Sequence, residues 1–375
     1  MSIISTKKNW INLTIWVVII ALIIAAPTFL PVFRLNLLGR YLSLAIVALG
    51  VDLIWGFTGM LSLGQGIFFA LGGYCAAMFL QLNSSEGFPN GIPEFFGLYG
   101  IEKLPFFWEP FKSSIFTLIS IWLLPAIIAG LLGYLVFRNR IKGVYFSILT
   151  QAALLVFFNF FNGQQKLING TNGLKTDVTE LFGQLVGSEI MQRGFFWLTA
   201  ILVIFAWLFS RWIVRDRFGD ILIGIRDDEP RVRFTGYNPV VFKTIIFSIA
   251  GGLAGISGAL YTVQSGIVSP QFMTVPFSIE MVIWVAVGGR GTLLGAILGA
   301  VFINYAKSLV SEALPASWMF IQGGLFIFVV TALPEGVLGW IRRGGLKELL
   351  YLIGINKKLK TYPSLEVNEQ GEVKS

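Results

Sequence analysis

Long runs of apolar residues alternate with short polar segments along most of the chain. The runs cover residues 11–33, 38–57, 61–82, 113–137, 143–161, 195–214, 244–266, 278–289, 292–311 and 317–340. A membrane-spanning helix needs roughly 20 predominantly apolar residues, so most of these runs are long enough to cross a bilayer. The pattern predicts an all-α, polytopic transmembrane helix bundle of about ten spans. Residues 1–350 would form one transmembrane domain, and 351–375 a polar cytosolic tail without regular structure.

The run at 278–289 is shorter than the others and leads into Gly288-Gly289-Arg290-Gly291. A helix that short does not cross the roughly 30 Å hydrocarbon core by itself. Non-helical backbone at membrane depth is tolerated only where protein or a water-filled cavity satisfies its polar groups. We therefore expect a broken or re-entrant helix in this part of the chain.

The composition excludes a soluble fold and most catalytic chemistry. Hydrophobic residues make up 55% of the chain and charged residues 13%, whereas soluble domains are about one quarter charged. The single cysteine and the absence of histidine predict no disulfide framework, no metal centre and no histidine-based catalysis. No G-x-x-x-x-G-K-[ST] phosphate loop occurs, so we expect neither ATP hydrolysis by this chain nor a bound cofactor. Transport, conduction or scaffolding remains.

The basic residues, which give a net charge of +8, follow the positive-inside pattern of membrane proteins. With a cytosolic N-terminus and alternating spans, the inner segments carry Lys7, Lys8, Arg138, Arg140, Lys142, Arg211, Arg215, Arg217, Arg226, Arg231, Arg233, Lys243, Arg290, Arg342, Arg343 and the tail from Lys347. The outer segments carry only Arg34, Arg40, Lys103, Lys112, Lys166, Lys175 and Arg193, with Lys307 near an outer end. This bias predicts a multi-pass membrane protein with both termini in the cytoplasm.

Four polar residues inside apolar runs are candidates for a translocation pathway, because polar groups in a membrane are costly and commonly functional. Asp52 and Gln65 flank the Gly56–Met60 turn and would lie at similar depth in an antiparallel hairpin, where they could pair. In the alternative interpretation Asp52 reaches interfacial water and Gln65 bonds a neighbouring backbone group.

The other two candidates are Gln151 and Glu280. Gln151 lies in the middle of a run, where an amide normally faces the bundle and joins helices. Glu280 follows Pro276 and Ser278 at the start of its run, where a carboxylate complements the helix dipole. For both residues a structural role and a pathway role remain open.

The predicted inner loop from Arg215 to Lys243 is the most charged stretch before the tail. Proline disfavours helical geometry at the residue before it, so Pro230 should end a short helix that begins at Phe218 and reaches Asp228. We expect this helix to lie on the cytoplasmic side.

On such a helix Ile221, Leu222 and Ile225 would share one face, since residues three and four apart are neighbours. The apolar stripe would suit a groove on a partner protein, with a charged rim that fixes the register. The rim would consist of Arg226, Asp228 and Glu229. The alternative is an amphipathic loop that rests on lipid headgroups.

Three ordered blocks of sequence stand out along the chain. The first is Gly56-Phe57-Thr58-Gly59-Met60-Leu61-Ser62-Leu63-Gly64-Gln65-Gly66, continuing to Gly72-Gly73-Tyr74. The second runs from Arg217-Phe218-Gly219 through Ile225-Arg226-Asp227-Asp228-Glu229 to Gly236-Tyr237, and the third from Ser278-Ile279-Glu280 through Gly288-Gly289 and Gly291-Thr292 to Gly295 and Gly299. Together these blocks resemble permeases of the branched-chain amino acid and urea ABC importers, which implies a place in a bacterial inner membrane. The resemblance covers the chain from about Leu37 to Arg343.

The resemblance implies a complex with a homologous second permease, two ABC ATPase subunits and a periplasmic solute-binding protein. It also implies that the second block contacts the ATPase, through Phe218, Gly219, Leu222, Ile225, Arg226, Asp228 and Glu229. The glycines of the first and third blocks would permit close helix packing; they are Gly59, Gly64, Gly66, Gly72, Gly73, Gly288, Gly289, Gly291 and Gly295.

Within this family Val51-Asp52-Leu53-Ile54-Trp55-Gly56 looks like the urea-type permeases of the LivM-like branch, because the amino acid permeases usually have Asn at the Asp52 position. Gln65 stands where some relatives have His. A urea pathway needs only hydrogen-bonding groups, and no Arg or Lys lies clearly in the middle of a predicted span. A branched-chain amino acid or short-chain amide permease, an ATP-independent urea channel or carrier, and a non-transporting scaffold are the alternatives.

Overall fold

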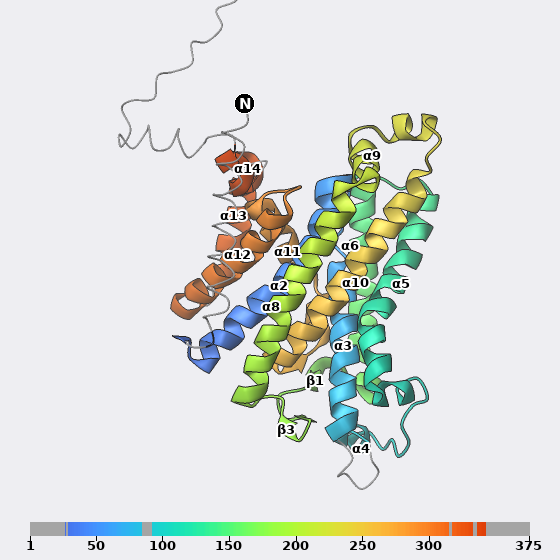
Figure 1. Ribbon diagram of the computed structural model, residues 1–375. Coiled ribbons are helices and arrows are strands. Elements are labelled where there is room, and N and C mark those ends of the chain that lie inside the picture. Colours follow the sequence, from blue (N-terminus) through green and yellow to red (C-terminus); the bar gives the residue numbers. More distant parts are fainter. Residues whose placement is uncertain (1–26, 28, 85–91, 315–316, 333–335, 343–375) are drawn as a thin grey trace, which may run out of the picture.

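A computed structural model describes residue 27 and residues 29–84, 92–314, 317–332 and 336–342. The described chain is a bundle of long helices, with α9 at one end and the short strands and α4 at the other (Figure 1). The main helices are α2 Val32–Thr58, α3 Gln65–Ser84, α5 Ser114–Arg138, α6 Val144–Gly163, α8 Glu189–Arg215, α9 Arg217–Phe234, α10 Pro239–Ser265, α11 Val275–Gly288, α12 Leu293–Ala313, α13 Trp318–Ala332 and α14 Gly336–Arg342. The short elements are α4 Glu94–Leu98, η2 Glu109–Lys112, α7 Gln165–Ile168, η3 Gly170–Asn172, β1 Leu174–Lys175, β2 Glu180–Leu181, β3 Gln184–Leu185, β4 Ile267–Val268 and η4 Pro270–Met273.

The predicted all-α membrane bundle is confirmed. Among the described residues, seven helices are long and apolar enough to cross a membrane, namely α2, α3, α5, α6, α8, α10 and α12. The predicted span at 11–33 lies largely outside the described residues, and the tail at 351–375 lies wholly outside them. The span predicted at 317–340 contains two described helices, α13 and α14, and residues 333–335 between them lie outside the described residues.

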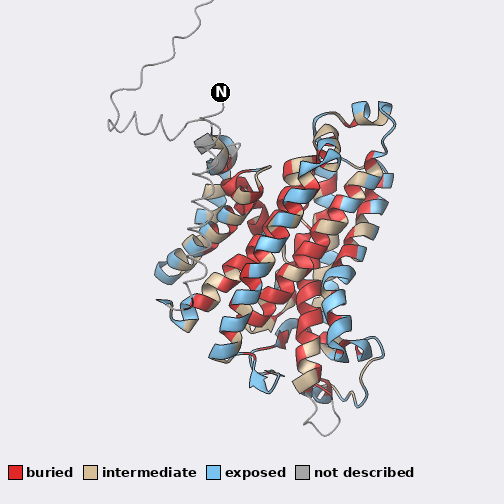
Figure 2. Ribbon diagram, viewed as in Figure 1, coloured by how far each residue is buried: buried red, intermediate tan, exposed pale blue. Residues whose placement is uncertain are grey.

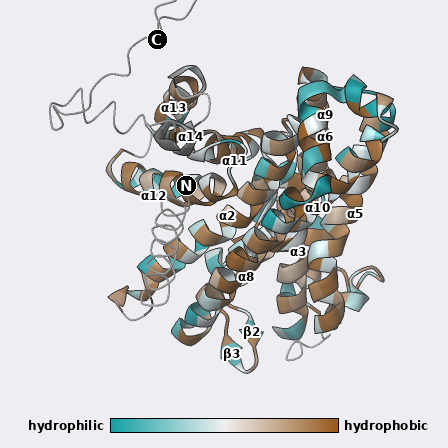
Figure 3. Cartoon of the chain, turned by 45° about the horizontal axis from the view of Figure 1, so that its top comes forward, coloured by the Kyte–Doolittle hydropathy of each residue, from teal (hydrophilic) through white to brown (hydrophobic). Residues whose placement is uncertain are grey.

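The interior of the bundle is formed by α2 and α3, which are buried over most of their length, while α5, α6 and α8 each expose a face (Figure 2). The exposed faces are apolar, with Ile119, Leu131, Val156 and Phe205 among their side chains. Such a continuous apolar exterior is expected where lipid tails replace water as the solvent. Hydrophilic residues concentrate instead at α9 (Figure 3).

Helix α10 packs against α2, α3 and α5, and small residues bring the backbones close together. A methyl group added to Gly72 of α3 would lie 2.0 Å from the carbonyl oxygen of Gly255 in α10. In the same way, a methyl group on Gly288 of α11 would lie 1.9 Å from the carbonyl oxygen of Gly295 in α12. The glycines that the sequence pattern selected therefore permit close helix contacts, as is common in membranes.

Helix α11 has 14 residues, a length of about 21 Å at 1.5 Å per residue. It is shorter than the roughly 30 Å hydrocarbon core, which agrees with the expected broken segment. The helix follows η4 and ends at the glycine-rich turn, and ten of its residues are buried. The protein itself therefore surrounds the short helix. At the far end of the bundle, β1 pairs with β4 and ties the segment after α6 to the end of α10.

Candidate functional site

The chain is not helical between α2 and α3. Helix α2 ends at Thr58 and is capped by Gly59, whose φ of 74° is left-handed, and α3 begins only at Gln65. The intervening segment lies against the first turns of α6: the Ser147 hydroxyl donates to the Leu61 carbonyl (2.6 Å), and the Leu63 N–H donates to the Thr150 hydroxyl (3.0 Å). Side-chain hydroxyls thus satisfy an interrupted backbone inside the bundle.

Gln65 is the first residue of α3 and is only 1% exposed. Neither the oxygen nor the nitrogen of its amide has a hydrogen-bond partner among the described residues. The next residue, Gly66, donates its N–H to the Ser278 hydroxyl of α11 (3.3 Å). A buried polar group without a partner requires an explanation, such as an unseen water or a ligand. Gln65 therefore presents a free donor and a free acceptor at a break between helices. Discontinuous helices commonly form the substrate sites of transporters.

The expected pair between Asp52 and Gln65 is not present, and Asp52 does not reach water either. Asp52 is fully buried in α2, and one carboxylate oxygen accepts the N–H of Gly291 (2.7 Å) from the turn between α11 and α12. Its second oxygen has no partner among the described residues. The sequence could not predict this contact, because the two residues are far apart along the chain.

Two arginines from different segments hold the end of α2. Arg290 stacks on the Trp55 ring (5.0 Å) and donates to the Trp55 carbonyl (3.2 Å), while Arg226 of α9 donates to the Gly56 carbonyl (3.0 Å). Burial and the charge of Arg226 lower the pKa of Arg290, and the Asp52 carboxylate partly offsets this effect. The end of α2 therefore joins the glycine-rich turn to the charged helix α9.

Helix α9 is kinked at Asp228, which has φ −156° and ψ 86°. The Asp228 carboxylate accepts the N–H of Arg231 (3.1 Å), so Asp228 caps the segment that follows. Pro230 then falls in the first turn of that segment, where a missing N–H costs little. The predicted end of the helix is therefore a kink, and the helix continues to Phe234.

The predicted orientation of the apolar stripe on α9 is also corrected. Leu222 is fully buried and Ile225 is 5% exposed, and α9 packs against α2, α8 and α10 of the same chain. The side chains expected to enter a partner's groove are thus used within this bundle. What α9 leaves exposed includes Asp227, Arg231 and Phe234, the last of which is 92% exposed.

Glu229, which was expected on the charged rim, is instead a buried ion-pair centre. Its carboxylate accepts hydrogen bonds from Lys243 of α10 and Arg233 of α9 (2.6 Å each), and Lys142 lies 3.1 Å away. Burial alone would raise the pKa of Glu229, but Lys243, Lys142 and Arg233 outweigh it and lower the pKa to about 2. A cavity of about 350 Å³ lies beside this cluster and reaches Gly59.

Glu280 lies beyond the first turn of α11 and is paired with Lys307 of α12, whose ammonium donates to both carboxylate oxygens (2.7 and 2.8 Å). The dipole explanation for Glu280 is therefore wrong. Lysines do lie inside the helices, since Lys243 and Lys307 belong to α10 and α12, but each is matched by a glutamate. Gln151 is half-buried, and it is its neighbour Thr150 that reaches the interrupted segment.

Sequence reasoning missed Ser147, Thr150, Lys243 and Lys307. Hydroxyl groups are common in membrane helices, so the two hydroxyl residues gave no distinctive signal. A lysine within an apolar run is a stronger signal, because it requires a partner.

Comparison with known proteins connects these features to a family. The family model described as "Branched-chain amino acid transport system / permease component" matches residues 33–330. The high-affinity branched-chain amino acid transport system permease protein LivM of Escherichia coli (strain K12) is 27% identical over 319 residues, which cover 79% of this chain and 68% of that protein. LivM of Salmonella typhimurium is 26% identical over 318 residues, with the same two shares.

The chain is also similar to LivH, another permease protein of the high-affinity branched-chain amino acid transport system of Escherichia coli (strain K12). The two are 22% identical over 313 residues, which cover 79% of this chain and 91% of LivH. No solved structure matches the chain. The region matched by the family model runs from α2 into α13. It includes the interrupted α2–α3 hairpin, the kinked α9 and the glycine-rich turn. This chain therefore belongs to the family of branched-chain amino acid transport system permease components.

Proposed function

We propose that this chain forms the translocation pathway of an ATP-driven importer for a small uncharged amide, with urea as the first candidate. The observation that carries the proposal is Gln65, which is buried at the break between α2 and α3 with both amide atoms unpaired. Urea has a carbonyl acceptor and N–H donors, so one primary amide can both donate to it and accept from it.

The charges near the pathway favour an uncharged solute. Lys307 is paired with Glu280, and Lys243 is paired with Glu229, which also binds Lys142 and Arg233. An amino acid carries a carboxylate, for which a free cation would be the preferred partner. Asp52, the buried acid of α2, accepts the Gly291 N–H through one oxygen. Branched-chain amino acid transport is the second candidate, because LivM and LivH are named for it.

ATP hydrolysis would occur in two separate ATPase subunits, and a periplasmic binding protein would deliver the solute. The similarity to both LivM and LivH supports a complex in which this chain pairs with a second, homologous permease. The complex would lie in a bacterial inner membrane with both termini of this chain cytoplasmic. The α9 end carries Arg138, Arg140 and Lys142 in addition to the basic residues of α9 itself, which supports a cytoplasmic position for it.

The decisive experiment is uptake by the complete complex reconstituted in vesicles. We expect ATP-dependent uptake of labelled urea, and we expect Gln65→Leu to lower it roughly tenfold because a buried hydrogen-bonding amide is lost. Gln81→Leu is the matched control, since Gln81 lies at the other end of α3 and bonds the Lys175 carbonyl. Uptake of leucine in place of urea would refute the proposed solute but not the permease role. Urea flux through this chain alone, without ATPase subunits, would refute the importer role.

A further inference from the structure

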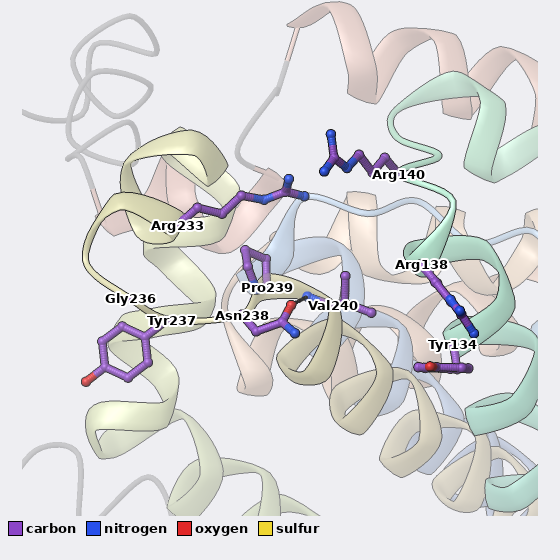
Figure 4. Close-up of a pocket in the computed structure, with 9 residues that line it drawn as sticks. All are labelled: Tyr134, Arg138, Arg140, Arg233, Gly236, Tyr237, Asn238, Pro239 and Val240. Carbon is purple, nitrogen blue, oxygen red and sulfur yellow. Dashed lines mark hydrogen bonds between the residues drawn. The ribbon is translucent and has the colours of Figure 1, made fainter.

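We propose that a basic pocket at the α9 end of the bundle binds the phosphate headgroup of an anionic membrane phospholipid. The pocket has a volume of about 390 Å³ and lies between the end of α5 and the turn from α9 to α10. Arg138 and Arg140 line it from the α5 side and Arg233 from the α9 side (Figure 4). In that view the guanidinium groups of Arg140 and Arg233 extend into the same space beside the start of α10.

The pocket has an excess of positive charge. Neither Arg138 nor Arg140 forms an ion pair with another residue in the part of the chain that the structure describes. Arg233 shares the single carboxylate of Glu229 with two lysines. The positive end of the α10 dipole adds to this field, because Asn238 and Pro239 line the pocket at the start of that helix. An anion is the ligand that such a site favours.

The backbone at Arg140 indicates that its side chain has a use. Its φ of 58° is in the left-handed region, where glycine or asparagine costs less than arginine. The turn is held by the Arg140 N–H, which donates to the Phe137 carbonyl (3.0 Å). A residue without a long side chain would satisfy the turn equally well. The turn does not require the guanidinium group of Arg140. A guanidinium group can donate two parallel hydrogen bonds to phosphate oxygens.

The surroundings identify the anion as a lipid. Tyr134 lines the pocket beneath Arg138, and one turn further along the same face of α5 is Leu131, which is 60% exposed. On α10, Val241 and Ile245 are also exposed. Beyond Arg140 a second cavity of about 600 Å³ runs along Tyr145 and Ile148 of α6. A headgroup at the arginines would therefore place its acyl chains on apolar helix faces, and basic pockets of this kind between transmembrane helices bind anionic lipids.

The test measures which lipids stay with the transporter complex when it is extracted from vesicles of equal parts phosphatidylglycerol and phosphatidylcholine. We expect native mass spectrometry to find phosphatidylglycerol enriched on the wild type. Arg138→Gln together with Arg140→Gln should weaken this binding roughly thirtyfold, because the double variant loses two positive charges at the membrane surface. The control is Arg211→Gln with Arg215→Gln, which removes equal charge from α8 at residues that do not line the pocket.

Equal retention of phosphatidylglycerol by the pocket variant and the wild type would overturn the proposal. Loss of the ATPase subunits from the pocket variant with unchanged lipid retention would also overturn it, because the pocket would then bind protein. A third contrary result is displacement of the lipid by millimolar inorganic phosphate, which would identify a site for soluble anions. Lipid retention is measured without transport, so it can fail or succeed independently of the proposed solute.

Discussion

Glu229 shows how the bundle controls a single charge. Its three cations come from three segments, the α5–α6 turn, α9 and α10, and they lower the pKa of its carboxyl group from 4.5 to about 2. A lowered pKa contributes stability that is complete above pH 4.5 and is lost as the pH falls through about 2. The attachment of α9 to the bundle should therefore weaken only in strong acid.

We expect Glu229→Gln to destabilise the chain by roughly 3 kcal/mol at neutral pH, since the buried Lys243 loses its counter-charge. The wild type should lose the stability contributed by Glu229 as the pH falls from 4.5 to about 2. The variant should not show this loss. Thermal unfolding followed by tryptophan fluorescence measures both effects. Asp220→Asn, which changes an exposed acid of the same helix, is the control. An acid profile identical to that of the wild type would contradict this account of Glu229.

At the scale of elements, α9 has two faces with different tasks. Leu222 and Ile225 pack on the bundle, and Arg226 bonds the end of α2. The opposite face exposes Arg231 and Phe234, and an exposed aromatic beside an arginine is a common composition of binding hot spots. Because Arg226 contacts the Gly56 carbonyl, a force on α9 would reach the interrupted hairpin directly.

We predict that the double variant Arg231→Glu, Phe234→Asp still inserts in the membrane. The amount of ATPase that co-purifies with it should fall roughly tenfold. Phe182→Asp is the matched control, because Phe182 is 91% exposed in the β2–β3 turn at the opposite end of the bundle. Leu222→Ala with Ile225→Ala should instead lower the thermal stability, since these side chains are core. If the exposed pair can be changed without loss of ATPase, the coupling contact lies on another element.

At the scale of the whole molecule, the two ends of the bundle differ in charge and structure. Helix α3 ends at the end of the bundle where α4 lies, and α9 lies at the other end (Figure 1). Reporter fusions at Asn83 and at Gly236 should therefore lie on opposite sides of the membrane, with the Gly236 fusion cytoplasmic. Accessibility of the two reporters to a membrane-impermeant reagent measures this. Both reporters on one side would refute the predicted topology.

The sequence alone was sufficient for the fold class, most span positions and the broken segment before the glycine-rich turn. These features depend on local requirements, because each span must be apolar over its own length and must satisfy its own backbone. Polar candidates such as Gln65 and Glu280 could also be selected, since the membrane makes such residues conspicuous.

Only the tertiary structure decided what those residues contact. Asp52 bonds Gly291 and not Gln65, Glu280 pairs with Lys307, and Leu222 faces its own bundle and not a partner. Each of these outcomes depends on which helix lies beside which, and local sequence patterns do not contain that information. Periodicity shows that one side of α9 is apolar, but the neighbouring helices determine what that side packs against.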